Sequence, residues 1–101
     1  FEPHRYSRVS SLKIQFAKSF SNSNLVLLCP IYAAGEKKDL KFNQINFAKL
    51  ISKYSHTQVI IIKNQNELVK YLKNNLSGSE IIIGMGAGSI SKWMRDLKNT
   101  L

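Results

Sequence analysis

The chain contains a single cysteine and no apolar stretch long enough to cross a membrane. Its longest apolar runs, residues 25–29 and 59–62, are as short as strands, whereas a membrane-spanning helix needs about 20 apolar residues. Cys29 lies inside one of these runs and has no partner for an internal disulfide, so we expect a buried, apolar side chain. The N-terminus also lacks the pattern of a secretory signal. We therefore expect no membrane contact and a reducing, cytoplasmic setting.

Acidic residues are scarce, because 6 aspartates and glutamates stand against 15 lysines and arginines, which gives a net charge of +9. A clustered basic excess would favour nucleic acid, since lysine and arginine neutralise phosphates. The lysines are instead scattered through every expected helix and strand, and a diffuse charge mainly promotes solubility. We therefore expect no nucleic-acid partner. The chain also lacks the His, Cys and carboxylate spacings of metal sites, so we expect no metal bound by this chain alone.

Helical and strand patterns alternate along the chain. Apolar residues at three- and four-residue spacing predict helices over about residues 9–20, 45–54, 64–76 and 89–97. Ser7 or Ser10 would cap the first helix, Asn64 and Glu67 resemble a capping box for the third, and Ser89 would cap the last. Apolar runs predict strands over residues 25–29, 58–62 and 80–84. The inward faces of the last three helices would carry Ile45, Ala48, Leu50, Ile51 and Tyr54, then Leu68, Tyr71, Leu72 and Leu76, then Ile90, Trp93, Met94 and Leu97.

This alternation predicts an α/β fold, a Rossmann-like open and mainly parallel sheet with flanking helices, formed by residues 1–101 as a single domain. Phe1, Glu2 and Pro3 read like the end of a strand that runs into a loop. We therefore expect the chain to be a fragment that is missing its first strand or strands. Such a sheet would have an exposed edge, which predicts self-association of the fragment.

Three unusual loops follow predicted strands, and the carboxyl edge of a parallel sheet is where ligands bind. They are "PHRYSR" at residues 3–8, "PIYAAGE" at residues 30–36 and "GMGAGS" at residues 84–89. Arg5 and Arg8 are three residues apart, so both guanidinium groups could bind one carboxylate or phosphate. Alternatively, one arginine pairs with Glu2 or Glu36 and the other is solvated, and the pattern does not decide between these possibilities.

The two histidines and the glycine-rich loop have simpler interpretations. A lone histidine beside a proline, such as His4, is typically a structural hydrogen-bonding residue, and we expect His56 on the surface. Gly84, Gly86 and Gly88 have the spacing G-x-G-x-G, which departs from the dinucleotide-binding pattern G-x-G-x-x-G. We expect these glycines to allow a tight turn and the close approach of another backbone or a ligand.

Taken together, "FEPHRYSR", "IYAAGE" and "GMGAGSI", in this order and spacing, resemble the C-terminal domain of the Mur ligases, the family that assembles the peptide of peptidoglycan. The resemblance covers nearly the whole chain. The discriminating stretch is "PHRYSR", which is similar to the loop of the members that join L-alanine to UDP-N-acetylmuramate. "KKDLKF" departs from the family, which often has proline and glycine there, and Ser89 stands where the family commonly has an acid.

The resemblance implies a cytoplasmic enzyme of three domains, in which a central domain binds ATP and Mg²⁺. ATP would phosphorylate the lactyl carboxylate of UDP-N-acetylmuramate, and the amine of L-alanine would attack the acyl phosphate. The phosphate-binding loop and the Mg²⁺ ligands are missing from this chain, which implies no ligase or ATPase activity for it alone. Residue by residue, the resemblance implies that Arg5 and Arg8 hold the alanine carboxylate and that His4 lines the pocket. The residues implied to shape the site are Tyr6, Tyr32, Gly35, Glu36, Gly84, Gly86 and Gly88.

A second hypothesis is a stand-alone α/β module that binds anions or nucleic acid, with "PHRYSR" as its basic patch. The reading frame upstream of Phe1 distinguishes the ligase hypothesis from the stand-alone module. A phosphate-binding loop a few hundred residues earlier supports the ligase, and a start codon next to Phe1 supports the module.

Overall fold

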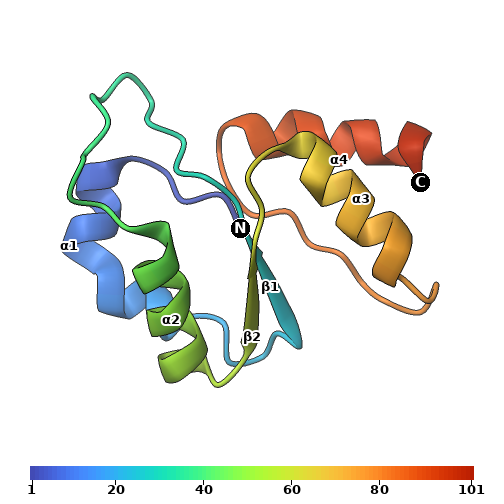
Figure 1. Cartoon of the computed structure of the whole chain (residues 1–101), viewed down its shortest axis with the longest axis horizontal. Coiled ribbons are helices and arrows are strands. Elements are labelled where there is room, and N and C mark those ends of the chain that lie inside the picture. The colour runs from blue at the N-terminus through green and yellow to red at the C-terminus, as the bar shows by residue number, and fades with distance from the viewer.

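The computed structural model describes all 101 residues and is a small, open α/β fold. Its elements are α1 (Tyr6–Ala17), β1 (Leu25–Leu28), α2 (Gln44–Ser55), β2 (Gln58–Ile61), α3 (Gln65–Asn75) and α4 (Ser89–Thr100). The two strands are parallel, with Leu25 opposite Gln58 and Leu28 opposite Ile61. Figure 1 shows α1 and α2 on one side of the strands and α3 and α4 on the other. The predicted alternation of helices with parallel strands is therefore confirmed for two strands.

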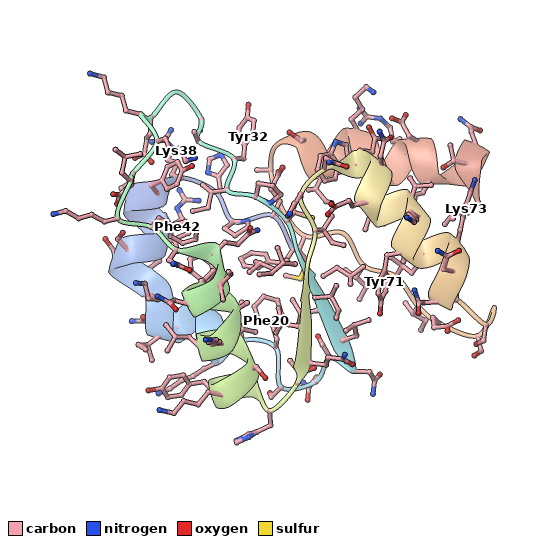
Figure 2. All side chains as sticks on the ribbon, viewed as in Figure 1. Phe20, Tyr32, Lys38, Phe42, Tyr71 and Lys73 are labelled. Atoms are coloured by element: carbon pink, nitrogen blue, oxygen red, sulfur yellow. The ribbon has the colours of Figure 1, made fainter.

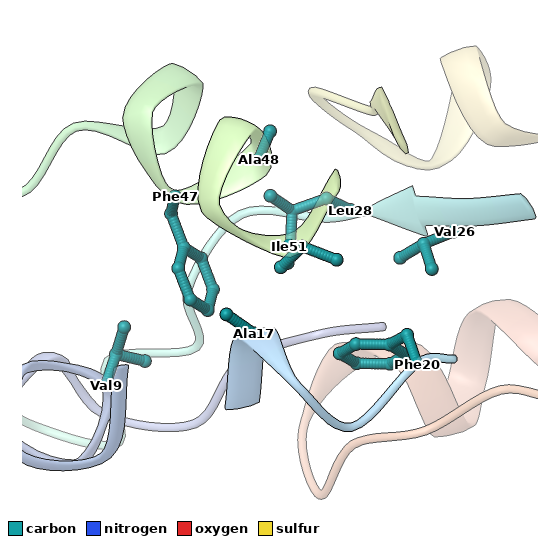
Figure 3. Close-up of a cluster of buried hydrophobic side chains, with 8 residues drawn as sticks. All are labelled: Val9, Ala17, Phe20, Val26, Leu28, Phe47, Ala48 and Ile51. Carbon is teal, nitrogen blue, oxygen red and sulfur yellow. The ribbon is translucent and has the colours of Figure 1, made fainter. Parts of the chain in front are cut away.

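Both faces of the strand pair are covered by helices, as the continuous apolar runs predict. Successive side chains of a strand point to opposite faces, so β1 contributes Val26 and Leu28 to one core and Cys29, just after it, belongs to the other. The first core consists of Val9, Ala17, Phe20, Val26, Leu28, Phe47, Ala48 and Ile51 (Figure 3). The second consists of Cys29, Ile62, Leu68, Leu72, Ile90 and Leu97, with Trp93 and Met94 half-buried against it.

Helix α1 begins and ends about three residues earlier than the pattern predicts. It begins at Tyr6, so Ser7 and Ser10 lie inside the helix, and the prediction that either serine is its N-cap was wrong. Phe20 lies in the turn after the helix but is still buried, which explains why the apolar spacing extended the prediction. The buried hydroxyl of Ser55 holds this turn, because it accepts a hydrogen bond from the amide of Phe20 and donates one to the carbonyl of Ala17.

The next two helices are capped by asparagines. Asn43 accepts a hydrogen bond from the amide of Asn46, and Asn64 accepts one from Glu67, whose carboxylate accepts one from the amide of Lys63. The predicted start of α3 at a capping box is therefore confirmed, although the carboxylate reaches back one residue beyond the cap. The predicted inner stripe of α2 is too wide, because two of its members, Ile45 and Tyr54, are exposed.

The predicted strand at residues 80–84 is absent. No backbone hydrogen bond joins residues 81–84 to any other segment, and Ile81 and Ile83 are 89% and 73% exposed. A strand exists only where a neighbouring backbone pairs with it, and the N-terminal segment bonds to this part of the chain only at Met85, through the amide of Glu2. The apolar run therefore has the composition of a strand but lacks the partner that would make it one.

The N-terminal segment lies beside β1. The terminal ammonium of Phe1 donates to the carbonyl of Leu27 at 2.8 Å, and the amide of Cys29 donates to the carbonyl of Phe1 at 2.9 Å. A parallel bridge between His4 and Tyr32 extends this pairing. The interpretation of Phe1 to Pro3 as the end of a strand is thus supported. None of the helices has the length and apolar character that a membrane span requires.

Candidate functional site

The three loops singled out by the sequence meet at one edge of the strand pair. Tyr32 anchors the first loop, since its amide donates to the carbonyl of Pro3 and its carbonyl accepts from the amide of Arg5, both at 2.8 Å. The third loop joins them where the amide of Glu2 donates to the carbonyl of Met85 at 2.9 Å. Tyr32 stands at this edge in Figure 2. The prediction that the three loops gather at one edge is therefore confirmed, although the segment before the third loop is not a strand.

The side chains of Arg5 and Arg8 are exposed and have no acidic partner. The single ion pair of the structure joins Lys92 to Asp96 on α4. No ion pair joins either arginine to Glu2 or Glu36, because both carboxylates bind backbone amides instead, although the nearby charge of Arg5 helps to lower the pKa of Glu36. Two guanidinium groups at the start of α1 thus keep all their donors available for an external anion.

Glu36 occupies the start of α1. Its carboxylate accepts hydrogen bonds from the amide of Ser7 at 3.2 Å and from the hydroxyl of Ser7 at 2.5 Å. These bonds, first of all the one from the hydroxyl, lower the pKa of Glu36 below its ordinary value. The first amides of a helix have no partner within it, and Arg5, at the cap position, makes no capping bond with its side chain. The side chain of Glu36 therefore serves as the N-terminal cap of α1, although Glu36 is distant in sequence.

The backbone is strained on both sides of this contact. Arg5 has φ +67° and Ala34 has φ +52°, a region that residues with a Cβ seldom adopt, and Gly35 follows with φ +88°. Such conformations cost about 1–3 kcal/mol each and cluster at functional sites. Only one other non-glycine residue, His56 at the end of α2, has positive φ, and it is exposed as predicted. The strain is therefore concentrated where the arginines are.

His4 is half-buried and stacks on Tyr32, with ring centroids 5.6 Å apart and planes 23° apart. Its Nδ1 atom is the one buried side-chain polar atom of the structure without a hydrogen-bond partner. The expectation that His4 is a structural hydrogen-bonding residue was therefore wrong. Unpaired buried polar atoms are rare, and a ligand is one of the partners that can explain them.

Close packing explains the three glycines of the third loop. A Cβ on Gly84 would lie 2.4 Å from Met94 Cγ, and one on Gly88 would lie 2.4 Å from the ring of Tyr32. Gly86 has φ +154°, and a Cβ there would lie 3.0 Å from the carbonyl oxygen of Glu2. The expected close approach is thus confirmed, with side chains and one backbone segment of the same chain as the neighbours.

The N-terminus of α4 is also occupied. Glu2 is buried, and its carboxylate accepts hydrogen bonds from the amides of Gly88 at 3.2 Å and Ile90 at 3.4 Å. The prediction that Ser89 caps this helix was wrong, because Gly88 is the cap residue and Glu2 supplies the acceptor. A phosphate at these amides would have to displace the carboxylate of Glu2, so the glycine-rich loop does not fit a nucleotide phosphate.

Aromatic packing supports the first turn of α1 from the other side. Tyr6 meets Phe42 edge-to-face with ring centroids 5.8 Å apart, and Phe42 continues to the buried Phe47. A short turn places Phe42 there, in which the amide of Lys41 donates to the side chain of Asp39. The segment "KKDLKF", which departs from the pattern of the Mur ligase family, therefore folds over Tyr6 and supports the arginine loop.

Two surface hollows lie elsewhere. One of about 580 Å³ lies between α3 and α4, and one of about 470 Å³ lies beside the start of α2. Neither of these two hollows is lined by a predicted site residue. No group of three or more His, Cys, Asp or Glu side chains is arranged to hold a metal ion.

Sequence reasoning missed the parts played by Glu2 and Ser7. Glu2 contacts residues more than 80 positions away, and no local pattern signals such a contact. Ser7 drew attention as a possible cap, but it acts as the donor that binds Glu36. A serine in the first turn together with a glutamate after a glycine was the only available signal.

No protein-family model matches the chain. It is 50% identical over 97 residues to the UDP-N-acetylmuramate–L-alanine ligase of Pelagibacter ubique, an alignment that covers 96% of this chain and 21% of that protein. Identity to the ligase of the same name from Paramagnetospirillum magneticum is 34% over 97 residues, covering 95% of the chain and 20% of the relative. The identity to the ligase of the same name from Vesicomyosocius okutanii is 36% over 90 residues, and this alignment covers 89% of the chain and 19% of the relative. The chain thus spans about a fifth of the length of these relatives.

Proposed function

We propose that this chain is the C-terminal, amino-acid-binding domain of a UDP-N-acetylmuramate–L-alanine ligase. Nearly its whole length is homologous to a segment of such ligases. The observation that carries the proposal is the pair of exposed, unpaired guanidinium groups of Arg5 and Arg8 on a loop fixed at the sheet edge. The complete enzyme would act in the cytoplasm and join L-alanine to UDP-N-acetylmuramate.

The two arginines would bind the carboxylate of L-alanine. A guanidinium group presents planar pairs of N–H donors that match the two oxygens of a carboxylate, so two such groups can both hold and orient it. Holding the carboxylate fixes the direction of the amine, which is the attacking group. His4, which is half-buried next to Arg5, would line the same binding site.

In the reaction, ATP would phosphorylate the lactyl carboxylate of UDP-N-acetylmuramate to an acyl phosphate. The amine of L-alanine would then attack this carbonyl, and phosphate would leave as the amide bond forms. The contribution of this chain is to bind and orient the amino acid, which replaces a collision between two molecules by a reaction between positioned groups.

ATP and Mg²⁺ would bind to parts of the ligase outside this chain. The two features that could attract a nucleotide, the glycine-rich loop and the start of α4, are filled by Tyr32 and Glu2. The complete enzyme would supply the phosphate-binding loop and the Mg²⁺ ligands. We accordingly expect the 101-residue chain to show no ATPase or ligase activity.

The complete protein and the chain alone test this proposal together. The protein that contains this segment should form the L-alanine conjugate of UDP-N-acetylmuramate with release of ADP, and the 101-residue chain should show no turnover. Absence of L-alanine ligation by the complete protein would refute the proposed function. Turnover of ATP by the chain alone would refute the assignment of the nucleotide site to other parts of the ligase.

The chain alone would also self-associate. Residues 81–84 have free backbone donors and acceptors, and the uncharged stretch "IIIGM" exposes Ile81, Ile83 and Met85. Exposed apolar segments with unpaired backbone groups tend to pair with another chain. A second copy offers the same segment, and residues 81–85 carry no charge that would oppose the pairing.

A further inference from the structure

Glu36 bridges two of the loops at the candidate site. Its carboxylate binds both the amide and the hydroxyl of Ser7, at 3.2 and 2.5 Å. Ser7 lies between Arg5 and Arg8 in the first turn of α1. The residue on the second loop is therefore bonded to the turn from which both guanidinium groups project.

The first turn of α1 has no other support of this kind. It carries no acidic residue, and its cap position makes no hydrogen bond through a side chain. The other three helices each have a side-chain oxygen that accepts from their first turn: Asn43 for α2, Asn64 for α3 and Glu2 for α4. Removing Glu36 would leave the amide of Ser7 without a protein partner, and the turn would fray.

The second loop adopts a strained conformation as it approaches Ser7. Ala34 has φ +52° two residues before Glu36, and Gly35 between them has φ +88°, which glycine adopts without strain. Arg5, on the other side of the contact, has φ +67°. Conformations of this kind persist only where the surroundings hold them, and the bonds between Glu36 and Ser7 connect the two strained segments.

We infer that Glu36 is a positioning residue for the amino-acid carboxylate, because it fixes the first turn of α1 and thereby the directions of Arg5 and Arg8. Glu36 acts through Ser7 and does not itself bind the carboxylate, which a negative charge would repel. This inference rests on the proposed function and adds to it a residue that sets the affinity for the amino acid.

Steady-state kinetics of the complete ligase test the inference. Glu36→Ala should raise the KM for L-alanine about tenfold and leave the KM for ATP within about twofold of the unsubstituted enzyme. Glu36→Gln should recover most of the loss, since its amide oxygen still accepts from Ser7. Ser7→Ala should cause a smaller rise, and adding it to Glu36→Ala should change little, because both remove the same contact.

Glu67→Ala is the matched control. Glu67 also accepts a hydrogen bond from a backbone amide at the start of a helix on the same sheet edge, but its helix, α3, carries neither arginine. This variant should keep the KM for L-alanine of the unsubstituted enzyme. An equal rise in the control would mean that any loosened helix start has this effect, and it would overturn the inference.

The remaining outcomes separate this inference from the proposed function. An unsubstituted ligase that does not join L-alanine would overturn both. An active ligase in which Glu36→Ala leaves the KM for L-alanine within about twofold, or raises the KM for ATP equally, would overturn the inference alone. If Glu36→Ala does not fold, Ser7→Ala decides: a rise in the KM for L-alanine supports the inference, and an unchanged value overturns it.

Discussion

The carboxylate of Glu2 accepts a hydrogen bond from the amide of Gly88 at 3.2 Å, although 86 positions separate the two residues. A second bond comes from the amide of Ile90. Together they attach the start of α4 to the segment that leads into the arginine loop. The loop is thus bound through Glu2 on one side and through Glu36 on the other, and its two arginines remain free.

Replacing Glu2 should loosen α4. Glu2→Ala would leave two amides without their acceptor at a buried position, which should lower the free energy of unfolding by about 1–3 kcal/mol. Glu2→Gln should lose less, because the amide oxygen still accepts. Urea unfolding followed by circular dichroism measures both, with Glu67→Ala, at a half-buried position, as a control of smaller effect. Equal stability of Glu2→Ala and the unsubstituted chain would contradict this role.

Gly88 should tolerate a side chain only if Tyr32 is removed. Gly88→Ala would place a Cβ 2.4 Å from the ring of Tyr32, and overpacking of this kind costs roughly 1–3 kcal/mol. In a Tyr32→Ala background the same substitution should cost less than about 0.5 kcal/mol. Unfolding measurements on the four combinations give the coupling between the residues. Simple additivity would show that the two residues are not in contact.

Glu80 should titrate at low pH. Hydrogen bonds from the backbone, the largest from Ser77, lower the pKa of Glu80 from 4.5 to about 2. Because the folded pKa lies below the unfolded one, this carboxylate stabilises the turn fully above about pH 4.5. That contribution is lost as the pH falls through about 2. NMR titration of the Glu80 side chain should show the low midpoint, whereas a midpoint near 4.5 would contradict the turn geometry.

The chain alone should form oligomers through residues 81–85. Light scattering should give a mass above that of one chain, and Ile83→Lys should return it towards the monomer by placing a charge in the uncharged segment. Leu40→Lys is a matched control, because Leu40 is 89% exposed in a different loop. A strict monomer at high concentration would refute the proposed self-association.

The elements that the sequence predicted correctly are those with local causes. The apolar runs around Val26 and Val59 pack against cores on both faces of the strand pair, and the cap formed by Asn64 lies within three residues of its partner. Residues 80–84 have an equally apolar pattern but form no strand, because strand formation depends on a neighbour that pairs with them. An apolar pattern alone therefore identifies a segment that can form a strand, but it does not show whether a neighbouring backbone pairs with it.

The candidate site also has a part that the sequence predicts and a part that it does not. Its three loops could be located from the sequence by their unusual residues, and the rule that ligands bind at the carboxyl edge of a parallel sheet placed them together. The third loop reaches this edge although residues 80–84 before it form no strand. The roles of Glu2 and Glu36 could not, because their hydrogen bonds reach partners 86 and 29 positions away. The same distant bonds removed the alternative in which an arginine pairs with either glutamate.

The most direct test of the account is the KM for L-alanine of the complete protein, the proposed ligase, with Arg5→Ala or Arg8→Ala. Hydrogen bonds to charged groups contribute about 1.5–3 kcal/mol, so each substitution should raise this KM roughly tenfold to a hundredfold. The KM for ATP should stay nearly constant, and Lys13→Ala, which removes an exposed charge from the same helix, should change neither value. A KM for L-alanine that is unchanged in both arginine variants would contradict the assignment of the carboxylate to this loop.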